Sequence, residues 1–170
     1  GVGGYCLTKD PGFLKFSSKY IFKNKIEFPI LDKTILVNSK MVNTSIKFIK
    51  KKIPNLNKKK ILLYGIGYKE DVDDLRYSPS LDLYWKIKKF SKLVDIYDPY
   101  YLNKKIKNIN FVNKCNFNKY DVALFCVGHH QLKKINIYNL SSKCIYFDLN
   151  NIFNKVNHKN LSKKNITFYE

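Results

Sequence analysis

The sequence predicts an α/β protein in which a mainly parallel sheet follows a helical segment. After about residue 56, short apolar runs of strand length alternate with helical patterns, whereas a single long stretch of helical periodicity precedes that point. An alternation of strand, helix and strand is typical of right-handed crossovers in one parallel sheet. We therefore place a domain boundary near residue 56, which divides the chain into residues 1–56 and 57–170.

The first part of the chain is predicted to be a glycine-rich loop followed by one long helix. The loop covers residues 1–12, GVGGYCLTKDPG. The helix is predicted from Leu31 to Ile53, with Asp32 as its N-cap and Pro54 as its stop. One stripe of this helix is apolar, formed by Ile35, Val42, Ile46 and Ile49 and widened by Leu36 and Met41. The polar run PNLNKKK that follows is interpreted as a linker.

Five apolar runs in the second part are predicted strands, namely KKILLYGIG, LVDIYDP, YDVALFCVG, KCIYFDL and NITFYE. A helix should begin where Ser78 provides the cap and Pro79 the first helical position. Its apolar face would consist of Leu83, Tyr84, Ile87 and Phe90. Ligands of such sheets bind at the carboxyl ends of the strands near the switch point, where the loop GYKEDVDDLRYSPS is predicted to lie. Gly65 and Gly67 alone are a weak dinucleotide signal, because the third glycine of that fingerprint is absent.

The formal net charge is +19, which raises the question of nucleic-acid binding. Only one of the 32 basic residues is an arginine, Arg76, and the lysines are scattered through every segment. Proteins that read nucleic acids usually depend on the planar fork of arginine, so a solvated lysine-rich surface is the better interpretation. We expect neither a nucleic-acid partner nor a membrane span, since no apolar run approaches the roughly 20 residues that a span needs.

The four cysteines, Cys6, Cys115, Cys126 and Cys144, form no CxxC pair, and the three histidines do not complete a metal-ligand spacing. No metal site is therefore predicted. Cys126 and Cys144 lie in apolar runs and should be small buried side chains. The pattern suits reduced thiols in the cytoplasm better than a disulfide framework.

Three stretches, in order and at their spacing, resemble the UDP-glucose/GDP-mannose dehydrogenase family of nucleotide-sugar dehydrogenases. These stretches are GVGGYCLTKDP, LLYGIGYKEDVDDLRYSPSLDLY and VDIYDPY. The first is similar to the family's Gly-Gly-x-Cys-x-x-(Lys/Val)-Asp loop at the catalytic cysteine. The second is similar to its (Tyr/Phe)-Lys-x-Asp-x-x-Asp-x-Arg-x-Ser-Pro loop. The likeness covers most of the chain and is weakest after about residue 130.

This resemblance implies a domain plan. Family members have an amino-terminal Rossmann domain that binds NAD, a central helical domain for dimerisation and a carboxyl-terminal Rossmann-like domain that binds the nucleotide sugar. Residues 1–56 would be the end of the central domain with the catalytic cysteine loop, and residues 57–170 the Rossmann-like UDP-sugar-binding domain. The chain is then expected to be a fragment without the NAD domain, inactive alone, and a homodimer whose interface includes the helix from Leu31 to Ile53.

The resemblance also implies an activity. The complete enzyme would use NAD to oxidise a UDP-hexose to the UDP-uronic acid for surface polysaccharide, with UDP-glucose, UDP-N-acetylglucosamine or UDP-N-acetylmannosamine as substrate. Cys6 would be the nucleophile that forms a thiohemiacetal and then a thioester. A neighbour such as Lys9, or bound NAD, should favour its thiolate. Asp10 would orient or activate the hydrolytic water, although a turn residue before Pro11 is an equally good interpretation of this aspartate.

The remaining site residues follow from the same motifs. Lys9 and Arg76 would contact NAD, and a structural ion pair of Arg76 with Asp73 or Asp74 is the alternative. The UDP-sugar would be bound by Gly1, Gly3, Gly4, Tyr68 and Lys69. We interpret His129 and His130 as surface or strand-end residues without chemistry.

The chain departs from the family pattern after the fourth predicted strand. Leu149 and Asn150 stand where the family tends to have glycine and arginine, which puts a sugar or subunit contact from that arginine in doubt. Tyr5 stands where many relatives have His or Ser, and Leu75 replaces a frequent Thr.

Two other functions stay open from the sequence. One is a non-catalytic Rossmann-like module that binds a nucleotide or a polyanion, the latter with steep salt dependence. The other is an inactive paralogue, against which the intact Cys6, Asp10 and Arg76 argue.

Overall fold

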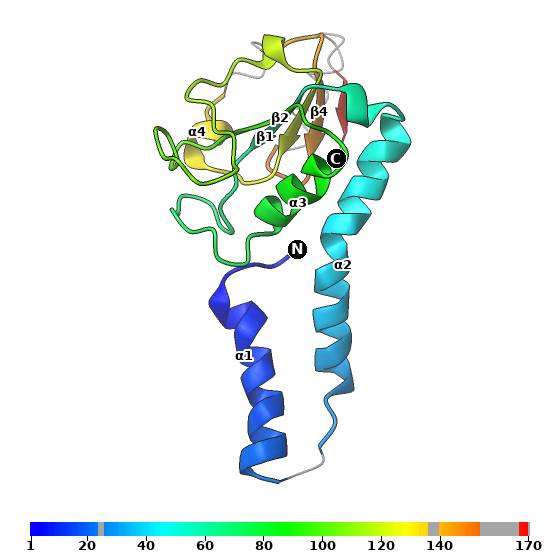
Figure 1. Ribbon diagram of the computed structural model, residues 1–170, viewed down its shortest axis with the longest axis vertical. Helices are drawn as coiled ribbons and strands as arrows, with labels where there is room; N and C mark the ends of the chain where they lie inside the picture. Colours follow the sequence, from blue (N-terminus) through cyan, green and yellow to red (C-terminus); the bar gives the residue numbers. More distant parts are fainter. Residues whose placement is uncertain (24–25, 136–139, 154–166, 170) are drawn as a thin grey trace.

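The computed structural model describes residues 1–23, 26–135, 140–153 and 167–169. An α/β region carries two helices that extend side by side from it (Figure 1). The first is α1 (Tyr5–Phe16), which continues into a short π-helical turn, η1 (Ser17–Ile21). The second is α2 (Pro29–Lys52). An ion pair between Lys15 and Asp32 joins the two helices near their far ends.

The long helix that the sequence predicts is confirmed as α2, with a different start. Pro29 occupies the first turn and Phe28 is the N-cap residue, so the prediction of Asp32 as the N-cap is wrong. Proline is well suited to the first helical position because its missing N–H would have no partner there. Asp32 lies in the first turn instead, where the partial positive charge of the helix end favours a carboxylate. The helix ends at Lys52, two residues before Pro54, as expected.

The predicted loop over residues 1–12 is correct only for its first four residues, because α1 begins at Tyr5. The glycines that suggested a loop are concentrated before this helix, and Gly4 ends the non-helical stretch with φ of 81°. Pro11 lies inside α1, where a proline removes one backbone hydrogen bond without preventing the helix. Cys6, Lys9 and Asp10 are therefore helical residues.

The sheet has five parallel strands in the order β2-β1-β3-β4-β5, which confirms the predicted α/β parallel-sheet fold. The five predicted apolar runs supply its strands, although residues 165, 166 and 170 of the last run lie outside the described residues. The strands are β1 (Ile61–Tyr64), β2 (Val94–Tyr97), β3 (Val122–Phe125), β4 (Ile145–Asp148) and β5 (Phe168–Tyr169). The other elements are η2 (Leu56–Lys58), α3 (Pro79–Lys88), η3 (Phe117–Lys119) and α4 (His130–Lys133).

The start of α3 is as predicted. Ser78 is its N-cap, with a side-chain oxygen that accepts a hydrogen bond from the N–H of Leu81 at 3.2 Å, and Pro79 follows in the first turn. The Ser78 hydroxyl also donates to the carbonyl oxygen of Ile66 at 2.7 Å. The cap therefore ties the start of α3 to the end of β1, and it fixes both ends of the intervening loop.

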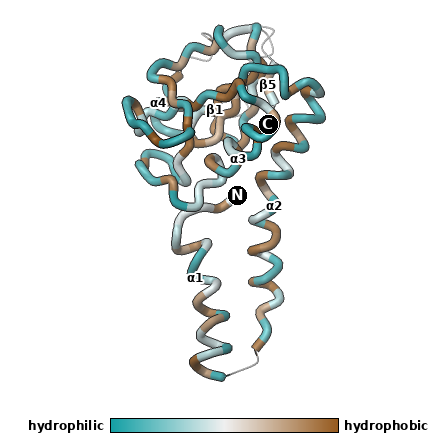
Figure 2. The backbone as a smooth tube through the Cα atoms, viewed as in Figure 1, coloured by the Kyte–Doolittle hydropathy of each residue, from teal (hydrophilic) through white to brown (hydrophobic). Residues whose placement is uncertain are grey.

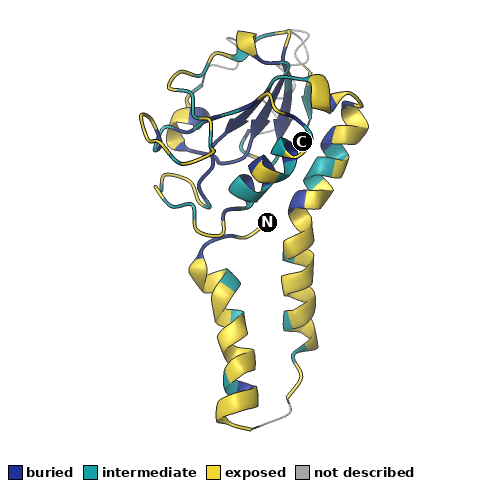
Figure 3. Cartoon of the chain, viewed as in Figure 1, coloured by how far each residue is buried: buried dark blue, intermediate teal, exposed yellow. Residues whose placement is uncertain are grey.

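The core lies on both faces of the sheet, which is dark blue in Figure 3. Strand residues of one face pack with the carboxyl-terminal half of α2 and with α3, and this cluster includes Val42, Ile49, Leu83 and Ile87. Leu56 of the predicted polar linker belongs to this core and is 1% exposed. The other face packs against α4 and the loops, and its cluster includes Leu62, Tyr64, Ala123, Phe125 and Tyr146.

The predicted apolar stripe of α2 is buried only in part. Val42 and Ile49 are buried and Ile46 is half-buried, whereas Ile35, Leu36 and Met41 are exposed. Figure 2 shows hydrophobic residues in the strands and also along the extended parts of α1 and α2. Of the predicted face of α3, Phe90 is only partly buried. Cys126 and Cys144 are buried, as predicted. Within the described ranges, no helix combines the length and apolar character that a membrane crossing requires.

Candidate functional site

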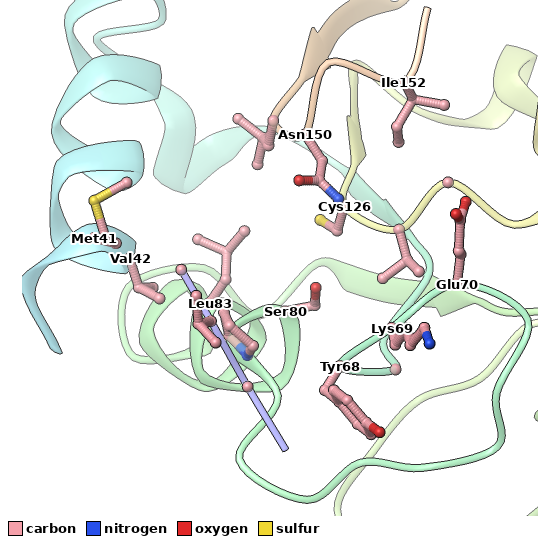
Figure 4. Close-up of a pocket in the computed structure, with 18 of the residues that line it drawn as sticks. Met41, Val42, Tyr68, Lys69, Glu70, Ser80, Leu83, Cys126, Asn150 and Ile152 are labelled. Atoms are coloured by element: carbon pink, nitrogen blue, oxygen red, sulfur yellow. The ribbon is translucent and has the colours of Figure 1, made fainter. Parts of the chain in front are cut away.

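A cleft of about 660 Å³ lies at the carboxyl ends of β1, β3 and β4. Because β1 pairs with β2 on one side and β3 on the other, this is where the chain reverses the order in which it adds strands. Such a switch point is the expected ligand position in an open parallel sheet. Met41 and Val42 of α2 lie on one side of the cleft, opposite Tyr68, Lys69 and Glu70 (Figure 4).

The glycine-rich amino-terminal segment forms part of the cleft wall, with Gly1 and Gly3 among its lining residues. It approaches the loop after β1 so closely that a side chain would not fit. A Cβ atom on Gly3 would lie 2.5 Å from the carbonyl oxygen of Tyr77 and 2.8 Å from Cβ of Tyr68. A Cβ atom on Gly4 would lie 2.8 Å from the ring of Tyr68, and the positive φ of Gly4 also favours glycine. The backbone amide of Gly4 donates to the carbonyl oxygen of Arg76 at 3.0 Å.

Asn38 of α2 holds the same segment from the other side. Its side-chain oxygen accepts from the N–H of Val2 at 2.7 Å, and its amide nitrogen donates to the carbonyl oxygen of Val2 at 2.9 Å. This pair satisfies both polar groups of the Val2 backbone. The sequence reasoning missed Asn38, because a single asparagine in a helical pattern carries no signal of what its side chain will bind.

Lys69 lines the cleft beside Tyr68. A second lysine, Lys133 of α4, lines it as well and forms an ion pair with Glu70 at 2.5 Å. This pair connects the loop after β1 to the segment after β3. The cleft is therefore bordered by two ammonium groups, which as point charges suit phosphate oxygens.

Arg76 forms the ion pair that the sequence left as an alternative. Its Nε and Nη2 atoms donate to the two carboxylate oxygens of Asp74, with distances of 2.9 Å and 2.5 Å. The hydrogen bonds from the guanidinium lower the pKa of the Asp74 carboxyl below its ordinary value. The guanidinium carbon also lies 4.6 Å from the ring centroid of Tyr5, which is a cation–π contact between the two motifs. Asp73 pairs with Lys104 instead.

Cys6, Lys9 and Asp10 lie on exposed parts of α1. Cys6 is the second residue of the helix, and Asp10 follows one turn later, so their side chains share a face. Lys9 Nζ is 3.9 Å from Asp10 Oδ1. Among the described residues that line the cleft, α1 contributes Leu7 and none of these three. The structure thus brings Gly1, Gly3, Tyr68 and Lys69 to one cleft, and places the predicted catalytic residues on the adjoining helix.

Two further polar residues at this end of the sheet escaped the sequence reasoning. Of the two interpretations of His129, a surface residue and a strand-end residue, the first is wrong, because His129 is fully buried in the segment that follows β3, whereas His130 is exposed. His129 Nε2 lies 3.2 Å from Oδ2 of Asp98, which is itself buried directly after β2. The sequence carried no signal of this pairing, because Asp98 and His129 follow β2 and β3, which lie on opposite sides of β1 in the sheet.

The residues that depart from the family pattern after β4 also line the cleft. These residues are Leu149 and Asn150, and Asn151 lines the cleft next to them. Figure 4 shows Asn150 close to Cys126. The pKa of Cys126 is raised to about 12, first because the thiol is buried and then because of the nearby Asp148 carboxylate. Cys126 is therefore a neutral, apolar part of the cleft.

Comparisons with known proteins match this architecture. Residues 62–155, more than half of the chain, match the model of the UDP-glucose/GDP-mannose dehydrogenase family, UDP binding domain. A UDP-N-acetyl-D-mannosamine dehydrogenase from Campylobacter jejuni is 38% identical over 87 residues, which cover 51% of this chain and 20% of that protein. A UDP-N-acetyl-D-glucosamine 6-dehydrogenase from Salmonella typhi is 30% identical over 142 residues, which cover 79% of this chain and 32% of that protein.

A solved structure supports the same relationship. The structure of a UDP-D-ManNAc dehydrogenase from Pyrococcus horikoshii superposes with a TM-score of 0.71 at 26% identity. The match covers 91% of this chain and 36% of that one. The chain thus spans between a fifth and a third of the length of the two curated relatives.

Proposed function

The chain belongs to the UDP-glucose/GDP-mannose dehydrogenase family, as the resemblance of its motifs predicted, and it contains the carboxyl-terminal, UDP-binding portion. From this premise we propose that it forms part of an NAD-dependent UDP-sugar 6-dehydrogenase that oxidises a UDP-hexose to the UDP-uronic acid. UDP-glucose, UDP-N-acetylglucosamine and UDP-N-acetylmannosamine are the candidate substrates, and surface polysaccharide is the proposed use of the product.

One observation carries this proposal. The glycine segment before Cys6 is docked against the loop that holds Tyr68, Lys69 and Arg76, through the hydrogen bond from Gly4 N to Arg76 O. The residues proposed for chemistry and those proposed for substrate binding are far apart in the sequence. Their contact beside a cleft at the sheet's carboxyl ends is what a single active site requires.

Substrate binding is assigned to the cleft. Lys69 supplies positive charge for the diphosphate, and Tyr68 offers an aromatic surface and a hydroxyl. Gly1, Gly3 and Gly4 are proposed to allow the chain to approach the sugar closely, with Gly1 and Gly3 in the cleft wall and the Gly4 amide holding Arg76. Lys133 also lines the cleft, where its ammonium group is paired with Glu70.

Cys6 is the proposed nucleophile. Its thiolate adds to the aldehyde carbon that the first oxidation produces, and the new C–S bond gives a thiohemiacetal after the oxygen takes a proton. Loss of a hydride from this carbon and of the hydroxyl proton gives a thioester. Water then adds to the thioester carbonyl, the C–S bond breaks, and the thiolate leaves with the carboxylic acid formed. Asp10, one helical turn from Cys6, is proposed to orient that water.

NAD would accept one hydride in each of the two oxidations. The residues of this chain that fit such a cofactor are Lys9 and Arg76, whose side chains are 45% and 58% exposed next to the glycine segment. Cationic side chains in this position suit the phosphates of a dinucleotide. We propose that the activity also needs an NAD-binding domain in addition to the residues described above.

The proposal includes a homodimer, a division of the chain at residue 56 and a cytoplasmic location. For the homodimer, α2 offers exposed apolar side chains at Ile30, Ile35, Leu36 and Val37. Burial of such a surface against a second copy would remove it from water. The Rossmann-like UDP-sugar-binding part would begin at residue 57, with the end of the dimerisation domain before it.

The test is an assay of the complete protein with NAD and each candidate UDP-sugar, in which NADH formation and the uronic acid are both measured. Cys6→Ala should abolish uronic-acid formation, whereas Cys115→Ala, at a half-buried thiol outside the cleft, should retain it. Uronic acid made by Cys6→Ala at the wild-type rate would refute the proposed role of Cys6. Binding of UDP to this chain is measured in parallel. Binding that falls steeply with salt and is equally strong for other polyanions would favour the non-catalytic alternative.

A further inference from the structure

His129, which follows β3, is held between Asp98 directly after β2 and Asp71 in the loop after β1. Its side chain is completely buried, and its two ring nitrogens face different partners. Nε2 lies 3.2 Å from Oδ2 of Asp98, and Nδ1 accepts a hydrogen bond from the backbone N–H of Asp71 at 3.0 Å. The ring of Tyr100 packs on the imidazole with a centroid distance of 5.1 Å.

These contacts determine the tautomer of His129. A backbone N–H can only donate, so Nδ1 must present its lone pair to Asp71. The ring hydrogen of the neutral imidazole is then on Nε2, from where it donates to Asp98. Asp98 is fixed in turn, because its carboxylate oxygens also accept from the N–H groups of Ile66 at 2.8 Å and Tyr100 at 2.9 Å.

His129 fixes the loop after β1, which carries Tyr68 and Lys69, the residues proposed to bind the substrate. Asp71 follows Lys69 by two residues and has an unusual backbone conformation, with φ of 57°. Its N–H donates to His129, and its carboxylate oxygen Oδ1 accepts from the backbone N–H of His130 at 2.9 Å. Two consecutive residues after β3 therefore hold one residue of the loop after β1.

His129 itself stands behind the cleft wall. In the segment between β3 and His129, Cys126, Val127 and Gly128 line the cleft, whereas His129 does not. His129 is therefore not placed to contact a ligand directly. Its buried ring reaches the cleft only through Asp71 and the loop.

We propose that His129 is a positioning residue that, as the Nε2–H tautomer set by Asp98, holds Asp71 and thereby keeps Tyr68 and Lys69 in place for the UDP-sugar. This role rests on the proposed function, since it assigns a purpose to the geometry of the same site.

The first test reads the tautomer directly. The ¹⁵N-labelled chain is studied by long-range ¹H–¹⁵N correlation at neutral pH, and the His129 signals are assigned by their loss in a His129→Gln variant. We expect a neutral ring protonated at Nε2, with an Nε2 hydrogen that exchanges slowly with water because the site is buried. A ring protonated at Nδ1, or at both nitrogens, would overturn the proposal, since neither state can accept the Asp71 N–H.

The second test compares the variants His129→Gln and His129→Asn, each of which can keep one of the two hydrogen bonds of the His129 ring. Glutamine can place its N–H near the position of Nε2 and keep Asp98, but it leaves Asp71 without an acceptor. Asparagine can place its oxygen near the position of Nδ1 and keep Asp71, but it does not reach Asp98. The Kd for UDP is measured for the chain, and KM and kcat for the UDP-sugar are measured for the complete protein.

We expect His129→Gln to raise the Kd for UDP and the KM by about tenfold with a smaller change in kcat, as the loss of one buried hydrogen bond predicts. His129→Asn should recover most of this loss. Equal binding by the wild type and a folded His129→Gln variant would overturn the positioning role, and so would a larger loss in His129→Asn than in His129→Gln. If the wild-type protein binds no UDP, the proposed function fails and the role fails with it, whatever the tautomer experiment shows.

Discussion

The backbone amide of Gly4 donates a hydrogen bond to the carbonyl oxygen of Arg76 at 3.0 Å, which joins two motifs from opposite ends of the helical segment. The contact is reinforced by side chains on both sides. The guanidinium of Arg76 lies over the ring of Tyr5, and the ring of Tyr5 meets that of Tyr77 edge-on at a centroid distance of 5.3 Å. The start of α1, and with it Cys6, is therefore placed by the loop that forms the cleft.

Gly3→Ala should damage this docking. The new Cβ atom would lie 2.5 Å from the carbonyl oxygen of Tyr77 and 2.9 Å from Cδ of Pro79, distances that require the backbone to move. We expect turnover of the UDP-sugar by the complete protein to fall by at least tenfold, because a displacement of about 1 Å at reacting groups has effects of this size or larger. The measurement is steady-state NADH formation.

Gly12→Ala is the matched control. A Cβ atom on Gly12 would meet nothing within 4 Å, and Gly12 lies inside α1, where alanine is the better helix former by roughly 0.5–1 kcal/mol. Turnover should be retained and thermal stability should be equal or slightly higher. If Gly3→Ala were tolerated as well as Gly12→Ala, the docked segment would not determine the geometry of the site.

Arg76→Lys should lower NAD affinity or turnover in the complete protein. Lysine cannot reproduce the planar fork that arginine offers to phosphates, and the loss of charge-assisted hydrogen bonds corresponds to roughly tenfold or more. KM for NAD and kcat are the quantities to measure. Unchanged kinetics would refute the cofactor role.

The variant Asp74→Asn distinguishes a role of Arg76 in NAD binding from a purely structural ion pair between Arg76 and Asp74. It weakens the contact with Arg76 and leaves the guanidinium in the chain. If Arg76 acts on NAD, Asp74→Asn should cost less than Arg76→Lys. If Arg76 serves only to pair with Asp74, the two variants should lose the same amount.

Asp98→Asn should change the acid stability of the fold. Burial raises the pKa of this carboxyl, but the hydrogen bonds from His129, Ile66 and Tyr100 outweigh it, and the pKa is lowered overall. The ionised group therefore adds stability that is fully present above the unfolded-state pKa of about 4 and is lost as pH falls through the lower folded pKa. We expect the variant to be less stable by about 2–3 kcal/mol at pH 7, with a smaller further loss below pH 4.

Chemical denaturation between pH 2 and pH 7 measures this difference. Asp82→Asn is the control, since it removes an exposed ion pair with Lys86 and should change the free energy of unfolding by less than about 1 kcal/mol. An Asp98→Asn variant with the same acid dependence as the wild type would show that the lowered pKa does not contribute to stability.

The sequence was sufficient for the parts of this molecule that local patterns determine. The strands follow from apolar runs, and the start of α3 follows from the Ser78–Pro79 pair, because strand burial and helix capping are local effects. The helix α1 was missed because Gly12 and Pro11 lower helix propensity, although neither prevents a helix whose other residues favour it. The pairing of Asp98 with His129 could not be predicted, since it depends on how the ends of β2 and β3 are brought together across β1.

In the candidate site, too, local sequence patterns indicated some residues, whereas residues placed by tertiary contacts were missed. The resemblance to the family's loop motif pointed to Tyr68 and Lys69, which line the cleft together because consecutive residues after a strand stay at its end. It gave no indication of Asn38, which reaches Val2 from another element through a side-chain contact. The roles of Cys6 and Asp10 stay predictions, since they depend on where bound ligands lie.

The four thiols should differ sharply in their reaction with an alkylating agent. Cys6 is exposed, whereas Cys126 and Cys144 are buried and Cys115 is partly covered. The pKa of each of these three is raised to about 12, mainly by burial, so at pH 8 they present almost no reactive thiolate. Brief treatment of the native protein with iodoacetamide should therefore add one label, on Cys6, and Cys6→Ser should add none. Peptide mass spectrometry locates the label, and a denatured sample serves as the control in which all four cysteines react. Rapid labelling of Cys126 in the native protein would contradict the burial of this thiol in the cleft wall.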